Sequence, residues 1–416
     1  MANPVSDHLM DLIKNLINMA SGAAISFVLL SYAFFAIIYF SLLDGRIRSK
    51  GGYIFVGSAL AVTIMGLGSG PLLLLGVLMF ASTFLLSELG PTLWDKNTGL
   101  AIMITSFVLF SVSMLDPNFY LIAAKPDNVP IVAMIFLLGF FTWLSLRKGY
   151  LNDKQIEAGG IPWEKTESSE KVFTWPDLVY IELLCMILGT VVLIVWSMAL
   201  PAPLEEAAKP SSSPNPAKAP WYFLGLQEML VYFDPWLAGV VLPTFIIIGL
   251  MAIPYIDTNP KGNGYFSFAE RKWELGIFMY GFLVLWSFLI ITGTFLRGPN
   301  WNFFGPFEFW DPNLLVPMNN VDLSEIIWVK MMNRPLPKLW IIRESFGIGL
   351  CLAYLGLPPV LARNLFKRFY LKMGAARYYV GASLFLIMLS LPIKMFLRWL
   401  FNIKYIVHIQ EIFFNI

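Results

Sequence analysis

Residues 178–200 read LVYIELLCMILGTVVLIVWSMAL, and this stretch indicates the fold class of the chain. It holds one charged residue, Glu182, and as an α-helix it is long enough to cross a hydrocarbon core about 30 Å thick. Similar apolar stretches recur along the 416 residues, of which 57% are hydrophobic and 13% are charged. Because soluble domains carry about 25% charged residues, the composition predicts an integral membrane protein.

The apolar stretches predict an all-α protein of about ten transmembrane helices. The expected spans lie at 22–43, 52–68, 71–88, 99–115, 129–146, 178–200, 237–256, 274–296, 344–362 and 378–397. Residues 1–21 precede them and predict an amphipathic helix in the membrane interface, because one helical face is apolar and holds Leu9, Leu12, Ile13, Leu16 and Ile17. Residues 147–174 form a polar linker, residues 302–343 a loop, and residues 344–416 the last two spans with a tail.

Lysine and arginine gather in alternate linkers, which predicts the orientation of the chain. The basic linkers lie near 44–51, 89–98, 147–177, 257–273 and 363–377. The linkers between them, near 116–128, 201–236 and 297–343, hold fewer basic residues for their length. Because basic loops stay in the cytoplasm, we expect the proline-rich loop 201–220 and the C-terminal tail on the outer side.

Haem and ion-translocation chemistry find little support in the sequence. The two histidines, His8 and His408, lie outside the expected spans, so we expect no bis-histidine haem held by this chain alone. Ionisable residues inside the spans are few; Glu182 lies near a helix start, and we expect Lys394 to snorkel to the interface. A transporter is therefore the least favoured class, and the net charge of +2 gives no reason to expect nucleic acid as a partner.

The loop after the sixth expected span is the most unusual segment. Regular helix and strand pairing are disfavoured there by six prolines, at positions 201, 203, 210, 214, 216 and 220. It leads into WYFLGLQEMLVYFDPW, residues 221–236, called here the aromatic segment. The residues alone leave two interpretations open: an aromatic belt at the interface, or a re-entrant segment that walls a pocket at membrane depth.

From Trp175 to about Trp301 the chain resembles the C-terminal part of cytochrome b, or subunit IV of bf-type complexes. It is especially similar to the menaquinol:cytochrome c reductases of bacteria with a split cytochrome b. The matching pieces are WPD at 175–177 with Glu182 and Cys185, PNPAKAPWYFLGLQE at 214–228, DPWLAGV at 234–240, IPYID at 253–257 and RGPNW at 297–301. Residues 1–146 and 302–416 carry no such match.

The resemblance implies that the aromatic segment lines an outward quinol-oxidation site. The family hallmark there is Pro-Glu-Trp-Tyr, whose Glu accepts a proton from quinol. Here the tetrad is Ala219-Pro220-Trp221-Tyr222, which lacks the carboxylate. The nearest carboxylates, Glu228 and Asp234, are the candidate proton acceptors. The candidate quinol pocket is aromatic and consists of Trp221, Tyr222, Phe223, Tyr232 and Phe233.

The resemblance also implies quinol or quinone, in that family menaquinone, and location in a bacterial inner (cytoplasmic) membrane. Since a chain without metal ligands cannot carry electrons across about 30 Å, the implied partners are a haem-b-binding cytochrome b subunit and an iron–sulfur protein, c-type cytochromes, or both. The favoured hypothesis is a haem-free membrane subunit of a quinol-oxidising complex. The alternative is a structural anchor whose quinone site is vestigial or filled by lipid. For residues 22–146, a scaffold and a relic of the haem-bearing half both remain open.

Overall fold

A computed structural model describes residues 94–167, 171–200, 202, 207, 209–259, 267–317 and 319–416. The expected interfacial helix and the expected spans 22–43, 52–68 and 71–88 lie outside these residues. The chain divides into two compact units, which are described separately. Unit 1 comprises Met1–Ala217, Lys261–Tyr280 and Thr294–Asn313, and unit 2 comprises Lys218–Pro260, Gly281–Gly293 and Leu314–Ile416.

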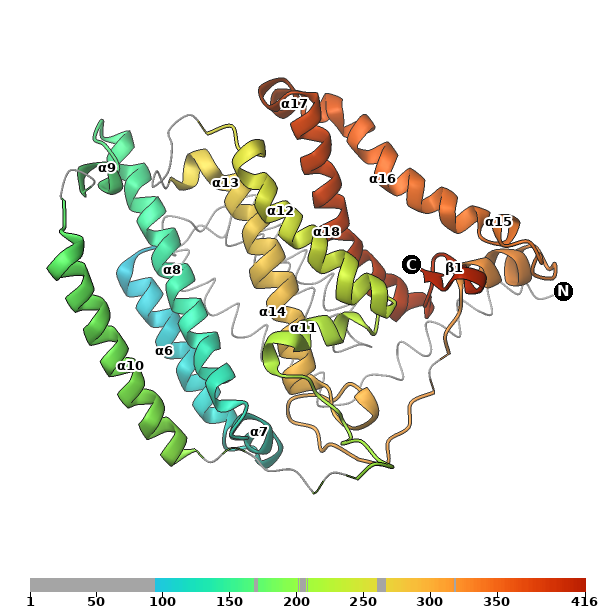
Figure 1. Cartoon of the computed structure of the whole chain (residues 1–416), viewed down its shortest axis with the longest axis horizontal. Helices are drawn as coiled ribbons and strands as arrows, with labels where there is room; N and C mark the ends of the chain where they lie inside the picture. Colours follow the sequence, from blue (N-terminus) through green and yellow to red (C-terminus); the bar gives the residue numbers. More distant parts are fainter. Residues whose placement is uncertain are drawn as a thin grey trace, which may run out of the picture. The chain divides into compact units, whose positions relative to one another are not determined.

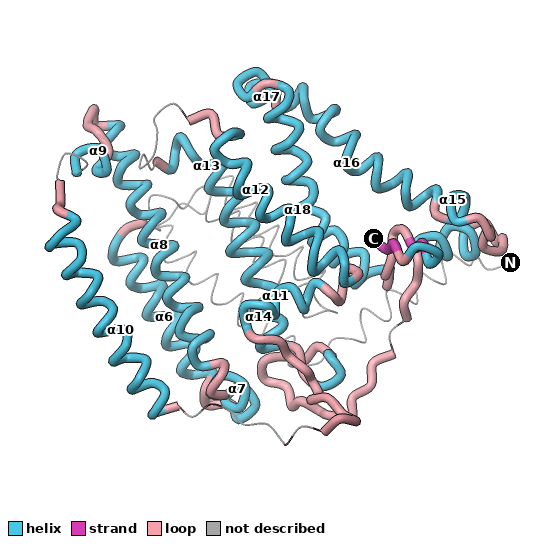
Figure 2. The backbone as a smooth tube through the Cα atoms, viewed as in Figure 1, coloured by secondary structure: helices cyan, strands magenta, loops and turns pink. Residues whose placement is uncertain are grey.

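Seven helices in the described part of the chain are long and apolar enough to cross a membrane (Figure 1). They are Lys96–Ser113, Val129–Glu157, Thr174–Ala199, Leu237–Ile256, Trp273–Leu296, Ser345–Leu365 and Ala375–Phe401. Each coincides with one of the seven spans expected between residues 99 and 397. The all-α membrane fold is therefore confirmed, while the count of ten spans stays a prediction. Among the described residues, strand is confined to one short antiparallel pair, β1 (His408–Ile409) with β2 (Phe414–Asn415) (Figure 2).

Unit 1 is organised around α8 (Val129–Glu157), which contacts α6 (Lys96–Ser113) and α13 (Phe268–Phe278). Asp153 of α8 fixes the start of α13, because its carboxylate accepts hydrogen bonds from Ser267 Oγ at 2.6 Å and from Ala269 N at 2.9 Å. Ser267 in turn caps α13 by accepting from the Glu270 backbone N–H at 3.4 Å. The shorter elements of this unit are α7 (Pro117–Ala123), α9 (Trp163–Glu167) and η5 (Pro299–Trp301).

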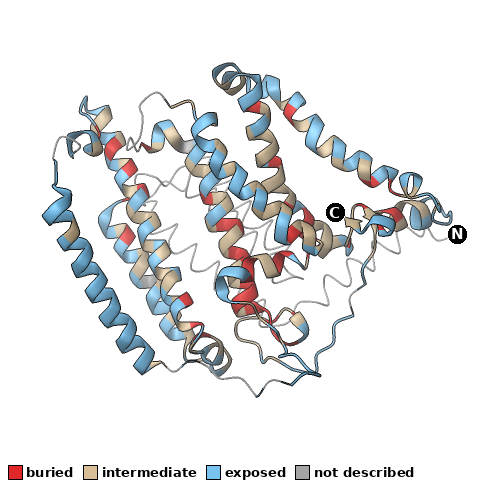
Figure 3. Ribbon diagram, viewed as in Figure 1, coloured by how far each residue is buried: buried red, intermediate tan, exposed pale blue. Residues whose placement is uncertain are grey.

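Helix α10 (Val179–Ala199), preceded by η1 (Thr174–Leu178), has no buried residue (Figure 3). Its apolar side chains are exposed on every face; Leu193 is 70% exposed and Met198 80% exposed. Such a surface is unfavourable in water, whereas hydrocarbon solvates it without cost. The burial pattern of α10 thus agrees with its assignment as a membrane span.

Unit 2 contains the aromatic segment and the last spans of the chain. Its helices are α11 (Trp221–Met229), η2 (Leu237–Val241), α12 (Leu242–Ile256), α14 (Ser287–Ile291), η6 (Glu325–Met331), α15 (Trp340–Arg343), α16 (Ser345–Leu365), α17 (Lys367–Met373), α18 (Ala375–Phe401) and η7 (Gln410–Ile412). The helical turns η3 (Met279–Trp286) and η4 (Thr292–Leu296) flank α14 in the Trp273–Leu296 span. Helix α18 packs on α12 and α16 (Figure 1).

The aromatic segment, the start of α16 and the tail (residues 402–416) meet at one side of unit 2. Lys404 of the tail donates to the carbonyl oxygen of Leu230, and the His408 backbone N–H donates to Glu344 at the start of α16. At the opposite side Gly374, with φ +80°, turns the chain from α17 into α18, a conformation that glycine adopts without strain. The aromatic segment and the tail therefore lie at the same side of unit 2.

Candidate functional site

The aromatic segment begins with a helical turn that is fixed by the residues before it. Gln227 Oε1 accepts a hydrogen bond from the Ala219 backbone N–H at 2.8 Å, and the Phe223 N–H donates to the Pro220 oxygen at 2.8 Å. Pro220 precedes the first residue of α11 and donates no backbone hydrogen bond, which suits the entry to a helix. The turn therefore sets the direction in which the first aromatic side chains project.

The five candidate pocket residues fall into two groups. Trp221, Tyr222 and Phe223 are 37%, 53% and 51% exposed, and their rings contact one another in sequence. Tyr232 and Phe233 are instead 0% and 3% exposed and lie in the core of unit 2. The structure thus presents the first three rings, called here the aromatic trio, to the surroundings, while the last two hold the segment in place.

Helix α11 lies unusually close to the Trp273–Leu296 span. A Cβ added at Gly225 would lie 3.2 Å from the ring of Trp286, and one added at Gly293 would lie 3.3 Å from the Leu224 carbonyl oxygen. The absence of both side chains lets the two backbones approach, as small residues do between membrane helices. This close packing gives the aromatic trio a rigid base.

The two candidate proton acceptors already accept hydrogen bonds within unit 2. Glu228 has no exposed surface, and its Oε1 accepts from the Tyr232 hydroxyl at 3.1 Å. Asp234 is half-buried, and its Oδ1 accepts from the Tyr405 hydroxyl at 3.1 Å and from Asn415 Nδ2 at 3.3 Å. Asp234 therefore ties the aromatic segment to the tail, a connection that the sequence did not predict.

The tail covers the C-terminal end of the aromatic segment through further contacts. Lys404 Nζ lies 3.2 Å from the Leu230 oxygen and 3.4 Å from the Val231 oxygen, and Trp236 Nε1 donates to the Asn415 oxygen at 3.1 Å. Burial lowers the pKa of Lys404. Burial and the hydrogen bond to Asp234 raise the pKa of Tyr405 to about 12. The Tyr405 hydroxyl therefore keeps its proton, and remains a donor to Asp234, at any physiological pH.

Lys394 lies inside this structure rather than at the interface. Its side chain is 1% exposed, its ammonium lies 5.7 Å from the centre of the Phe233 ring, and it has no hydrogen-bond partner in the described part of the chain. The expectation that Lys394 snorkels outward is wrong, because α18 packs the side chain against the aromatic segment instead. Sequence reasoning placed this lysine near a helix end and had no means of seeing the segment that covers it.

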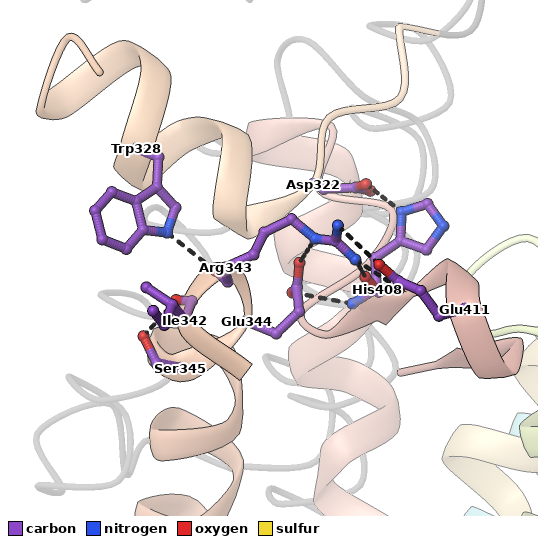
Figure 4. Close-up of polar contacts among 8 residues, drawn as sticks. All are labelled: Asp322, Trp328, Ile342, Arg343, Glu344, Ser345, His408 and Glu411. Carbon is purple, nitrogen blue, oxygen red and sulfur yellow. Dashed lines mark hydrogen bonds and ion pairs between the residues drawn. The ribbon is translucent and has the colours of Figure 1, made fainter. Parts of the chain in front are cut away.

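The tail is anchored at the start of α16 by charged groups, shown in Figure 4. Arg343 pairs with Glu344 at 3.1 Å and with Glu411 at 3.0 Å. Glu344 also accepts from the His408 backbone N–H at 3.0 Å, and Asp322 Oδ2 contacts His408 Nδ1. The hydrogen bond to Glu411 raises the pKa of Arg343, and Arg343 lowers the pKa of Glu411. The sequence signal for this cluster was weak, since its members lie far apart along the chain.

Residues 207–296 match the family model described as cytochrome b (C-terminal)/b6/petD. This segment is a cytochrome b C-terminal domain. It contains the aromatic segment, α12 and the Trp273–Leu296 span, so the resemblance inferred from the sequence is confirmed over these residues. No solved structure matches the chain.

The cytochrome b C-terminal domain implies a multi-pass membrane subunit of a quinol-oxidising electron-transfer complex. Domains of this family bind quinone in bc and b6f complexes, together with other cytochrome b, iron–sulfur and cytochrome c subunits. Helices α16 and α18 and the tail lie beyond the matched residues. Residues outside the matched segment therefore form part of the surface that packs against the cytochrome b C-terminal domain.

Proposed function

We propose that the chain is a haem-free membrane subunit that contributes the outward-side quinol pocket of a bc-type assembly. The observation that carries the proposal is the aromatic trio on α11, exposed within a cytochrome b C-terminal domain and mounted on closely packed helices. A quinol has a planar ring and an apolar isoprenoid tail, and pockets for such molecules are lined mainly by apolar and aromatic side chains.

In this proposal the two groups of aromatic residues have different tasks. Trp221, Tyr222 and Phe223 contact the quinol ring and the first part of its tail, whereas the buried Tyr232 and Phe233 position the segment. Glu228 and Asp234 are the candidate proton acceptors inside the matched domain. Each accepts from a tyrosine hydroxyl at one of its two carboxylate oxygens, which fixes the position of the carboxylate.

The surroundings of the subunit follow from its chemistry. A haem-b-binding cytochrome b subunit, an iron–sulfur protein or c-type cytochromes receive the electrons, and menaquinol is the proposed substrate. The resemblance favours the inner membrane of a bacterium, and the basic linkers favour loop 201–220 on its periplasmic side. Residues 175–301 form the quinol-site region, residues 147–174 a cytoplasmic linker, and residues 22–146 a five-helix region whose role stays open.

Replacing the aromatic trio one residue at a time tests the proposal. In the purified complex, Trp221→Ala, Tyr222→Ala and Phe223→Ala should each lower kcat/KM for a menaquinol analogue about tenfold to a hundredfold, because each removes apolar contact worth about 1.5–3 kcal/mol. Trp163→Ala is the matched control, since Trp163 is 54% exposed on α9, outside the matched domain. Unchanged kinetics in all three variants, with the complex still assembled, would rule out the pocket.

A structural anchor with a vestigial quinone site is the second candidate. It is favoured by one observation, that Glu228 and Asp234 are both engaged within unit 2 while the tetrad lacks its carboxylate. For an anchor, the three alanine variants leave quinol oxidation unchanged, and only assembly responds to substitutions on the surface of the domain. The same measurements therefore separate the two functions.

A further inference from the structure

The corner that joins α16 to α18 carries a concentrated positive charge. Residues 363–377 include no Asp or Glu, and the nearest carboxylates along the chain are Glu344 and Glu411. The corner holds five basic residues, called here the basic corner: Arg363, Lys367, Arg368, Lys372 and Arg377. All five are exposed, and none forms an ion pair with a carboxylate in the described part of the chain.

Two other basic linkers differ from the basic corner, because acidic residues balance their charge. Residues 147–177 hold five basic and six acidic residues, and residues 257–273 hold three basic and two acidic residues. Arg271 also pairs with Glu274 at 3.1 Å. Basic residues suffice to keep a loop in the cytoplasm, since Asp and Glu contribute little to topology. Membrane orientation therefore does not explain why the basic corner lacks carboxylates.

Aromatic rings give the basic corner a defined shape. Tyr370 of α17 lies edge to face against Tyr378 of α18, with 5.4 Å between ring centroids, and the Arg363 guanidinium lies 4.9 Å from the centre of the Tyr370 ring. The Tyr378 hydroxyl donates to the carbonyl oxygen of Pro359 in α16 at 3.0 Å. Figure 1 shows α17 at the end of the α16–α18 pair. The cations therefore project from a fixed frame at the end of two membrane spans.

Helix α17 has the polarity of a helix that lies in a membrane interface. Its apolar side chains Phe369, Tyr370 and Met373 are half-buried, whereas its three basic side chains are exposed. Leu371 of α17 is 70% exposed and Leu365, just before it, is 80% exposed. Exposed leucines among exposed cations suit the boundary where acyl chains meet phosphate groups.

We propose that the basic corner binds the phosphate groups of anionic phospholipids in the adjacent membrane leaflet. Phosphate supplies the negative charge that the surrounding chain does not, and Arg and Lys donate charge-assisted hydrogen bonds to its oxygens. Leu365 and Leu371 contact the acyl chains of the same lipids. The alternation of basic linkers predicts this corner on the cytoplasmic side, where anionic lipids make the surface potential negative. The aromatic segment lies at the opposite side of unit 2, so lipid binding here is independent of the quinol pocket.

Binding of spin-labelled phosphatidylglycerol to the purified complex tests the proposal, with spin-labelled phosphatidylcholine as the zwitterionic comparison. Wild type should bind the anionic lipid about tenfold more tightly or better, since each cation near an anionic surface contributes about fivefold. The triple variant Lys367→Gln, Arg368→Gln and Lys372→Gln should lose most of this preference. Raised ionic strength should weaken it in wild type, because these cations are exposed.

A matched control removes the same charge from the balanced linker. Lys148, Lys154 and Lys165 are exposed, and their combined replacement by Gln should leave the lipid preference intact. Lys367→Arg with Lys372→Arg keeps the charge of the basic corner and should keep the preference as well. If the triple variant does not assemble, Arg368→Gln alone carries the test and should weaken phosphatidylglycerol binding about fivefold.

Four results would overturn the proposal. Wild type could bind both lipids equally, or the variants of the basic corner could retain the preference in full. An equal loss in the control variant would show that total charge, and not the basic corner, selects the lipid. Displacement of phosphatidylglycerol by excess inorganic phosphate would assign the corner to a soluble anion. A cross-link from Lys372 to an acidic segment of another subunit would assign it to a protein.

Discussion

Gly347 is the point where the tail crosses helix α16. A Cβ at this position would press into the Ile406 carbonyl oxygen, with the carbonyl carbon at 3.0 Å and Val407 Cγ2 at 3.1 Å. The shortest ordinary distance between a carbon atom and a carbonyl oxygen is about 3.3 Å. Gly347→Ala therefore requires the tail backbone to move away by about 1 Å or more. No rotamer change relieves the contact with Ile406, because its opposing atoms belong to the backbone.

Gly349, two residues further along the same helix, provides a matched control. A Cβ at Gly349 has no atom within 4 Å. Both Gly→Ala variants gain roughly 1 kcal/mol from helix propensity, so this term cancels between them. The difference in the free energy of unfolding then isolates the clash at Gly347, which we expect at about 3 kcal/mol, the upper end for overpacking against a rigid neighbour.

The assay is thermal unfolding of the purified complex, combined with limited proteolysis of residues 402–416. Gly347→Ala should unfold at a lower temperature than Gly349→Ala, and its tail should be cleaved faster. Quinol oxidation should also slow, because the hydrogen bonds from Lys404 and Tyr405 to the aromatic segment are weakened. Equal unfolding temperatures and equal cleavage rates in the two variants would contradict the docking of the tail on α16.

Three further substitutions probe the same region. Lys394→Met should increase the free energy of unfolding by about 1–4 kcal/mol and so raise the unfolding temperature of the complex. The reason is that it replaces a buried ammonium that has no acceptor in the described part of the chain. A lower unfolding temperature would contradict this. Arg343 lowers the pKa of Glu411 from its ordinary 4.5. The ion pair therefore contributes its full stabilisation of the tail above pH 4.5, and this stabilisation is lost as the pH falls through the lowered pKa. Hydrogen exchange of the tail should show this loss at acid pH, and Glu411→Gln should not show it. Tyr405→Phe should weaken tail docking by about 1.5–3 kcal/mol, because it removes a hydrogen bond to the carboxylate of Asp234; unchanged proteolysis of the tail would argue against that contact.

The membrane spans were predictable because each depends on a local property, the length of an apolar stretch. The helix Leu237–Ile256 has the expected bounds, and Ala375–Phe401 extends the expected 378–397 by about one turn at each end. The aromatic segment was also recognisable, because its residues are contiguous and match a family. Both features can be recognised in the sequence without knowledge of the tertiary structure.

The partners of the aromatic segment were not predictable from the same signals. Asp234 meets Tyr405 and Asn415, which lie 171 and 181 residues further along the chain. Nothing in hydrophobic periodicity pairs one loop with another at that distance. The error on Lys394 has the same origin, since snorkelling is inferred from distance to a helix end, whereas burial here depends on the fold of the aromatic segment over α18.

Photolabelling tests the central claim, that residues 221–236 line a quinol-oxidation pocket, most directly. A menaquinone analogue with a photoreactive ring substituent would be irradiated with the purified complex, and the labelled peptides of this chain identified by mass spectrometry. The pocket predicts label on Trp221, Tyr222 or Phe223, and loss of that label when excess menaquinol competes. Label confined to other parts of the complex, with the aromatic trio unmodified, would contradict the claim.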